Sequence, residues 1–132
     1  MAPTIKPSEM VTVDYLAYSM GGPKRWDVVA FEHPGFSGQM WLMRIVGLPG
    51  EVISFTNGNL LINGQVPRPP ARLAAIHYSD PAWLPPGVSF TNPFVVPSNA
   101  YYVLGDNVTN ANDSRFWGSL PRTNILGKLL GK

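Results

Sequence analysis

Residues 51–64 read EVISFTNGNLLING, and this stretch decides the fold class. Two runs rich in β-branched and large apolar residues flank Asn57-Gly58, a dipeptide that tolerates the positive φ angles of a two-residue type I′ turn. A second Asn-Gly dipeptide follows at residues 63–64. We therefore predict strands at 51–56 and 59–62, joined by a tight hairpin turn and continued as a short meander.

The neighbouring segments also favour strands. Residues 27–31 and 41–46 are apolar on both faces and end at turn residues, which is typical of central strands. Residues 10–16 alternate in polarity with the period of two expected of a half-buried strand. Further strands are predicted at 94–96, 101–104 and 124–130. We expect an all-β, mainly antiparallel fold with little helix.

The composition agrees with short elements joined by turns. The chain has 132 residues, and its 14 Pro and 13 Gly stand against only 14% charged residues. This length predicts one domain, residues 1–132. Residues 67–86 contain six prolines and are predicted to form an insertion or surface loop, with at most one or two helical turns near 72–77.

Several classes of function are disfavoured. The net charge is only +2 and no run of like charges occurs, so a nucleic-acid partner is not expected. The absence of cysteine excludes disulfides and thiolate catalysis. No apolar run approaches the roughly 18 residues of a membrane span. His33 and His77 are the only histidines, no cluster has the spacing of metal ligands, and we expect both to be ordinary surface or loop residues.

Residues 105–118, GDNVTNANDSRFWG, combine turn formers with a compact set of charges. Gly and Asn favour tight turns, and the carboxylates of Asp106 and Asp113 are near the Arg115 guanidinium in sequence. Charge-assisted hydrogen bonds between such groups hold a loop rigid. We interpret this segment as a rigid polar loop that supports a site.

The same segment closely resembles the box near the C-terminus of type I signal peptidases. Three other segments resemble boxes of that family, in the family's order: residues 43–51 (MRIVGLPGE), 24–31 (KRWDVVAF) and 1–5 (MAPTI). Together these boxes cover the chain from end to end, although the Pro-rich stretch has no motif of its own.

The resemblance implies a serine endopeptidase that removes signal peptides, with a serine nucleophile, a lysine base and no metal or cofactor. Its partners would be signal-peptide-bearing preproteins or extended peptides. It would act on the extracytoplasmic face of a bacterial cytoplasmic membrane, held by an anchor that this chain does not contain. The family's substrate groove maps onto Ile5, Ala30, Met40, Trp41 and Leu42. Its structural support maps onto Arg44, Asp106, Asp113 and Arg115.

The catalytic positions depart from the family pattern. Met43 occupies the position of the family's lysine, Ala111 that of the serine that orients the lysine, and the nucleophilic serine would precede Met1. A thioether cannot take a proton from a hydroxyl, so the base is absent. A serine at 111 with no amine to bond would leave a buried hydroxyl unsatisfied at a cost of about 1–3 kcal/mol, which favours joint loss of the two residues after activity was lost.

Three interpretations stay open from the sequence. The domain is a catalytically inactive module that binds signal-peptide-like segments, a truncated or engineered form of an active signal peptidase I, or an enzyme with an unrecognised replacement base.

Overall fold

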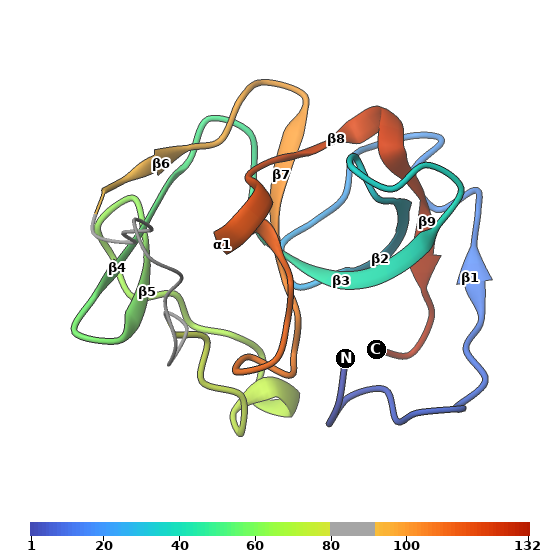
Figure 1. Ribbon diagram of the computed structural model, residues 1–132, viewed down its shortest axis with the longest axis horizontal. Helices are drawn as coiled ribbons and strands as arrows, with labels where there is room; N and C mark the ends of the chain where they lie inside the picture. Colours follow the sequence, from blue (N-terminus) through green and yellow to red (C-terminus); the bar gives the residue numbers. More distant parts are fainter. Residues whose placement is uncertain (80–91) are drawn as a thin grey trace.

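The computed structural model describes residues 1–79 and 92–132, which form two antiparallel sheets (Figure 1). The larger sheet has the strand order β1-β9-β2-β3-β7-β8, and the smaller one has the order β5-β4-β6. The strands are β1 (Val13–Asp14), β2 (Val28–Glu32), β3 (Met40–Gly47), β4 (Val52–Thr56), β5 (Asn59–Ile62), β6 (Phe94–Val95), β7 (Ala100–Leu104), β8 (Leu120–Pro121) and β9 (Ile125–Leu129). The predicted all-β, mainly antiparallel class is confirmed.

The hairpin of β4 and β5 forms as its sequence predicts. Asn57 and Gly58 have φ angles of 51° and 79°, and Thr56 pairs with Asn59 across the turn. Both central residues thus adopt the left-handed conformation that a type I′ turn requires. The second Asn-Gly dipeptide, at residues 63–64, has φ angles of 52° and 78° and reverses the chain again.

In the part of the chain that the structure describes, each helical segment is a single turn. The 3-10 turn η1 (Ala71–Leu73) lies in the Pro-rich stretch, where one or two turns were expected, and η2 (Arg122–Asn124) precedes β9. The single α-helical turn α1 (Ser114–Trp117) was not predicted. The remainder of the predicted Pro-rich insertion, from residue 80 on, lies outside the described residues.

The prediction of a strand at 10–16 is mostly wrong. Only β1 pairs, through Val13 with Leu129 and Asp14 with Lys128, and Met10 is 96% exposed. The alternation of side chains was nevertheless informative, because Val11 and Val13 pack against a buried cluster that includes Leu129. Side chains at these alternate positions pack against the core, but the backbone meets β9 at only two residues.

The largest hydrophobic cluster joins the two sheets. It contains Val46, Ala100, Tyr102 and Leu104 from β3 and β7 of the larger sheet. The smaller sheet and its flanks contribute Ile53, Phe55, Leu60, Ile62, Tyr78 and Val96. This cluster therefore lies between the sheets and includes Leu104, the last residue of β7, after which the loop at 105 begins.

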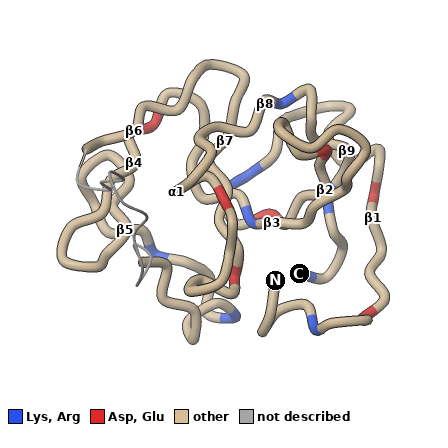
Figure 2. The backbone as a smooth tube through the Cα atoms, in the orientation of Figure 1, with Lys and Arg blue, Asp and Glu red and all other residues tan. Residues whose placement is uncertain are grey.

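Charged residues of both signs are spread along the chain (Figure 2). Within residues 1–79 and 92–132, no helix has the length and apolar character needed to span a membrane.

Candidate functional site

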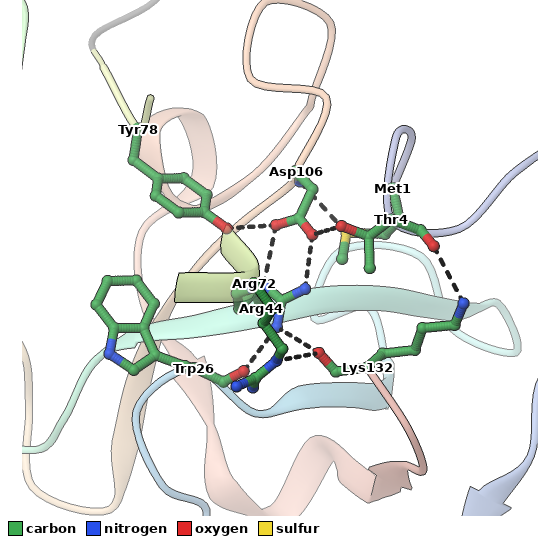
Figure 3. A network of polar contacts seen from close by, with 8 residues as sticks. All are labelled: Met1, Thr4, Trp26, Arg44, Arg72, Tyr78, Asp106 and Lys132. Carbon is green, nitrogen blue, oxygen red and sulfur yellow. Dashed lines mark hydrogen bonds and ion pairs between the residues drawn. The ribbon is translucent and has the colours of Figure 1, made fainter. Parts of the chain in front are cut away.

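Asp106 is the centre of a buried polar network (Figure 3). Arg44 donates to it twice, from Nε to Oδ1 over 3.0 Å and from Nη2 to Oδ2 over 2.7 Å, and both side chains are fully buried. The hydroxyl of Tyr78 donates to Oδ1, and the hydroxyl of Thr4 donates to Oδ2. Segments that are far apart in the sequence thus meet at one carboxylate.

Arg44 also fixes the backbone around this carboxylate. Its Nη1 donates to the carbonyl oxygens of Trp26, over 2.7 Å, and Lys132, over 3.0 Å. Burial by itself raises the pKa of Asp106, but hydrogen bonds from Arg44, Thr4 and Tyr78 outweigh burial and hold that pKa below its usual value. Asp106 is therefore ionised at neutral pH and serves as the counter-charge of Arg44.

A second buried ion pair stiffens the same loop. Arg115 donates from Nε and Nη2 to the two carboxylate oxygens of Asp113, each over 2.8 Å, and the Gly105 amide donates to Asp113 over 3.0 Å. Asp113 also caps α1 by accepting from the Arg115 amide. Burial raises the pKa of Asp113, and these donors oppose that rise. The four residues predicted to give ionic support, Arg44, Asp106, Asp113 and Arg115, thus form two separate ion pairs, each with its aspartate on the loop after β7.

A groove of about 550 Å³ lies beside this network. One wall comes from the start of β3, where Met40, Trp41 and Leu42 line the groove, and another from residues 1–7, including Ile5. Its lining is completed by Met1, Ala2, Lys6, Pro7 and Asn107. Four of the five predicted substrate-groove residues therefore line one cavity.

Ala30 is the exception. It pairs with Leu42 across β2 and β3, is fully buried, and packs in a cluster with Ile5. Contrary to our expectation, Ala30 does not line the groove but supports two of its residues from behind.

The groove runs along a free strand edge. β2 pairs with β3 from Met40 to Arg44, whereas β7 joins the other side of β3 only from Arg44, opposite Leu104. Beyond Leu104 the chain turns into the loop at 105. Within the described residues, no strand pairs with this side of β3 from Met40 to Met43, and this edge is available to an added strand.

Met43 and Ala111, which we expect from the sequence to occupy the positions of the family's lysine and its orienting serine, both have apolar side chains. Met43 is 6% exposed and belongs to a buried cluster with Val29 and Ile45. Ala111 lies against the end of β7, so closely that a Cβ added to Gly105 would be 2.5 Å from the Cβ of Ala111. Neither side chain has a group that accepts or donates a proton.

A larger hollow, of about 660 Å³, lies elsewhere and is lined in part by Arg25, Trp26, Glu51 and Arg68. It contains none of the predicted groove residues, and Arg25 and Glu51 neutralise each other through an ion pair of 2.7 Å. The larger volume of this hollow therefore does not identify it as the site. The residues predicted from the sequence boxes line the smaller groove instead.

Comparison with known proteins agrees with this geometry. A sequence model of the family described as "Signal peptidase, peptidase S26" matches residues 1–130. This chain belongs to the signal peptidase family. It is 32% identical to a signal peptidase I of Leptolyngbya laminosa, over 97% of the chain and 61% of that protein. It is 37% identical to signal peptidase I U of Bacillus subtilis, over 92% of the chain and 63% of that protein.

A solved structure shows the same relationship. The crystal structure of a signal peptidase I from Enterococcus faecalis superposes with a TM-score of 0.59 at 29% identity, over 80% of this chain and 95% of that one. This signal peptidase domain spans about 60% of the length of the curated relatives described above.

The sequence did not reveal every residue of the network. Thr4 lies inside the box at residues 1–5, so its position was a signal that we did not use. Tyr78 lies in the Pro-rich stretch without a motif, and no local pattern connects it to Asp106. His33 was expected to be an ordinary surface or loop residue and does lie in the loop between β2 and β3. Its side chain is buried, however, with its ring centroid 4.3 Å from that of Trp41.

Proposed function

We propose that this domain binds extended segments resembling signal peptides, in the groove between β3 and residues 1–7, without cleaving them. The observation that carries the proposal is Met43, a buried methionine at the position of the family's catalytic lysine. Family membership, the free edge of β3 and the groove lining give it further support.

The binding half of the proposal rests on the edge of β3. An extended peptide added beside Met40–Met43 would form main-chain hydrogen bonds with backbone groups that no described strand uses. Ile5 and Leu42 give the groove an apolar lining, suited to small apolar side chains. Because few side chains contribute, we expect weak binding, with a dissociation constant near the millimolar range, or about −4 kcal/mol.

The catalytic half rests on the side chains at 43 and 111. A serine nucleophile needs a neighbouring base, and neither a thioether nor a methyl group removes a proton from a hydroxyl. Loss of one member of a catalytic set typically reduces the rate by about 10⁴- to 10⁶-fold. The domain should therefore hold a peptide and release it intact.

In the full-length protein, we propose that the natural ligands are signal-peptide-bearing preproteins at the extracytoplasmic face of a bacterial cytoplasmic membrane, with an anchor outside residues 1–132. Membership in the signal peptidase family supports this placement.

The test is an NMR titration of the ¹⁵N-labelled chain with an Ala-x-Ala peptide. Shifts should saturate at Met40–Leu42 and Asn107. Leu42→Arg places a charge in the groove and should weaken binding by at least about tenfold, since an unpaired charge is costly in an apolar site. Leu126→Arg is the matched control, because Leu126 is 41% exposed on β9 and does not line the groove. The proposal fails if the parent does not bind, or if Leu42→Arg binds as well as Leu126→Arg.

A further inference from the structure

Two consecutive residues of the Pro-rich stretch contact both buried ion pairs of the site. The Tyr78 hydroxyl donates to Asp106 Oδ1 over 2.5 Å. The carbonyl oxygen of Ser79 accepts from Arg115 Nη1 over 2.9 Å. A segment without any family motif thus touches the two pairs that shape the loop beside the groove.

Tyr78 is itself held firmly from the smaller sheet. Its side chain is 5% exposed and packs in the cluster between the sheets, with the Trp26 ring stacked at 6.0 Å. Its carbonyl oxygen accepts from the Leu60 amide of β5 over 3.3 Å. The position of the Tyr78 hydroxyl is therefore set by packing that does not involve the groove.

Asp106, the partner of Tyr78, connects two parts of the groove wall. Through Oδ2 it accepts from Thr4, within the wall of residues 1–7, and its amide donates to the Met1 sulfur over 3.4 Å. Asn107, the next residue in the chain, lines the groove from the loop (Figure 3 shows the network). A rotation of the carboxylate of Asp106, next in the chain to Asn107 of the lining, would thus disturb its contact with Thr4 in the wall of residues 1–7.

We propose that Tyr78 is a positioning residue for the peptide groove, which holds the Asp106 carboxylate so that residues 1–7 and Asn107 keep a fixed spacing. This inference rests on the proposed peptide-binding function. Without the phenol, the carboxylate keeps the two hydrogen bonds from Arg44 and the one from Thr4, but Oδ1 loses its only donor from the side of the smaller sheet, and the carboxylate is held less tightly. Burial raises the pKa of Tyr78 far above its usual value, with a further rise from the Asp106 charge, so the phenol is protonated and can donate at neutral pH.

The experiment compares Tyr78→Phe with Tyr18→Phe in the full chain. Tyr18 is a matched control, because its hydroxyl also donates to a carboxylate, that of Asp27 over 2.8 Å, and it does not line the groove. Both variants lose one hydroxyl and one Tyr–Asp hydrogen bond. Amide hydrogen exchange at Thr4, Asp106 and Asn107 and affinity for an Ala-x-Ala peptide are measured for the parent and both variants.

Tyr78→Phe should accelerate exchange at these three amides and weaken peptide binding by about three- to tenfold, a part of the strength of a hydrogen bond to a charged group. Tyr18→Phe should leave both readouts at the parent value, even where its melting temperature falls equally. If Tyr78→Phe shows parental exchange and parental affinity, or if the two variants behave alike, Tyr78 has no positioning role.

A parent chain that fails to bind the peptide refutes the proposed function, and the exchange measurement then decides the role of Tyr78 alone. A further readout needs no variant. In the parent, the Tyr78 hydroxyl proton should be visible by NMR and protected from solvent exchange. A Tyr78 hydroxyl that exchanges rapidly with water overturns the inference even where Tyr78→Phe does not fold.

Discussion

Replacement of Asp106 by Asn keeps the size of the side chain but removes the charge that compensates Arg44. Both side chains have 0% exposure, and Arg44 donates two hydrogen bonds to this carboxylate. Loss of one partner of a buried ion pair leaves an uncompensated charge, at a cost of about 3–5 kcal/mol. An unfolding entropy of about 2.1 cal/mol/K per residue converts this cost to a fall in melting temperature of roughly 10–18 °C.

The assay is urea unfolding at pH 7, followed by tryptophan fluorescence, with Glu51→Gln as the matched control. Glu51 also pairs with an arginine, Arg25, but these two side chains are 16% and 27% exposed. Solvent weakens such a pair, so its loss should cost about 1 kcal/mol or less. If Asp106→Asn and Glu51→Gln differ by less than about 1 kcal/mol, the buried Arg44–Asp106 pair does not stabilise the fold more than the more exposed Arg25–Glu51 pair does.

Three further predictions concern the same region. Met43→Lys should lower the unfolding free energy by about 3–4 kcal/mol at pH 7, and the loss should shrink as the pH rises toward 10, because a buried amine is neutral when folded and charged when unfolded. Urea unfolding across that pH range, with Met43→Leu as control, checks this. Gly105→Ala should cost about 1–3 kcal/mol in thermal melts, since its Cβ would be 2.5 Å from that of Ala111. The lowered pKa of Asp106 means that its contribution to stability is present at neutral pH and lost as the pH falls below about 4. An acid titration by near-ultraviolet circular dichroism should therefore show a larger loss for the parent than for Asp106→Asn.

Local sequence patterns predicted the parts of the fold that local chemistry controls. The Asn57-Gly58 turn was predictable because few dipeptides tolerate two successive positive φ angles. The length of the strand predicted at 10–16 could not be predicted from its local pattern, because a strand also needs a pairing partner. β9 pairs with this segment only at Val13 and Asp14. The helical turn α1 depends on the cap from Asp113, whose carboxylate was assigned to the ionic support alone.

In the site, too, residues within sequence motifs were predicted, whereas residues held by tertiary contacts were not. Leu42 and Ile5 were placed by the family boxes and do line the groove, whereas Ala30, beside Leu42 in the sheet, is fully buried in a cluster with Ile5 and Leu129. Tyr78 had no signal in the sequence, because its bond to Asp106 joins residues 28 positions apart through the packing of two sheets. Side chains that contribute to the site only through tertiary contacts can be identified from the structure but not from the sequence.

Mass spectrometry of a signal-peptide substrate distinguishes binding without cleavage, which we propose for this domain, from slow hydrolysis. The substrate, which contains an Ala-x-Ala sequence, is incubated with the chain at a concentration at which NMR shows the groove to be occupied. We predict that the peptide mass stays unchanged over a day while the shifts at Met40–Leu42 persist. Cleavage after the Ala-x-Ala sequence that copurifies with the chain, and is abolished by mutation of one of its own serines, would contradict this proposal and reveal a replacement base.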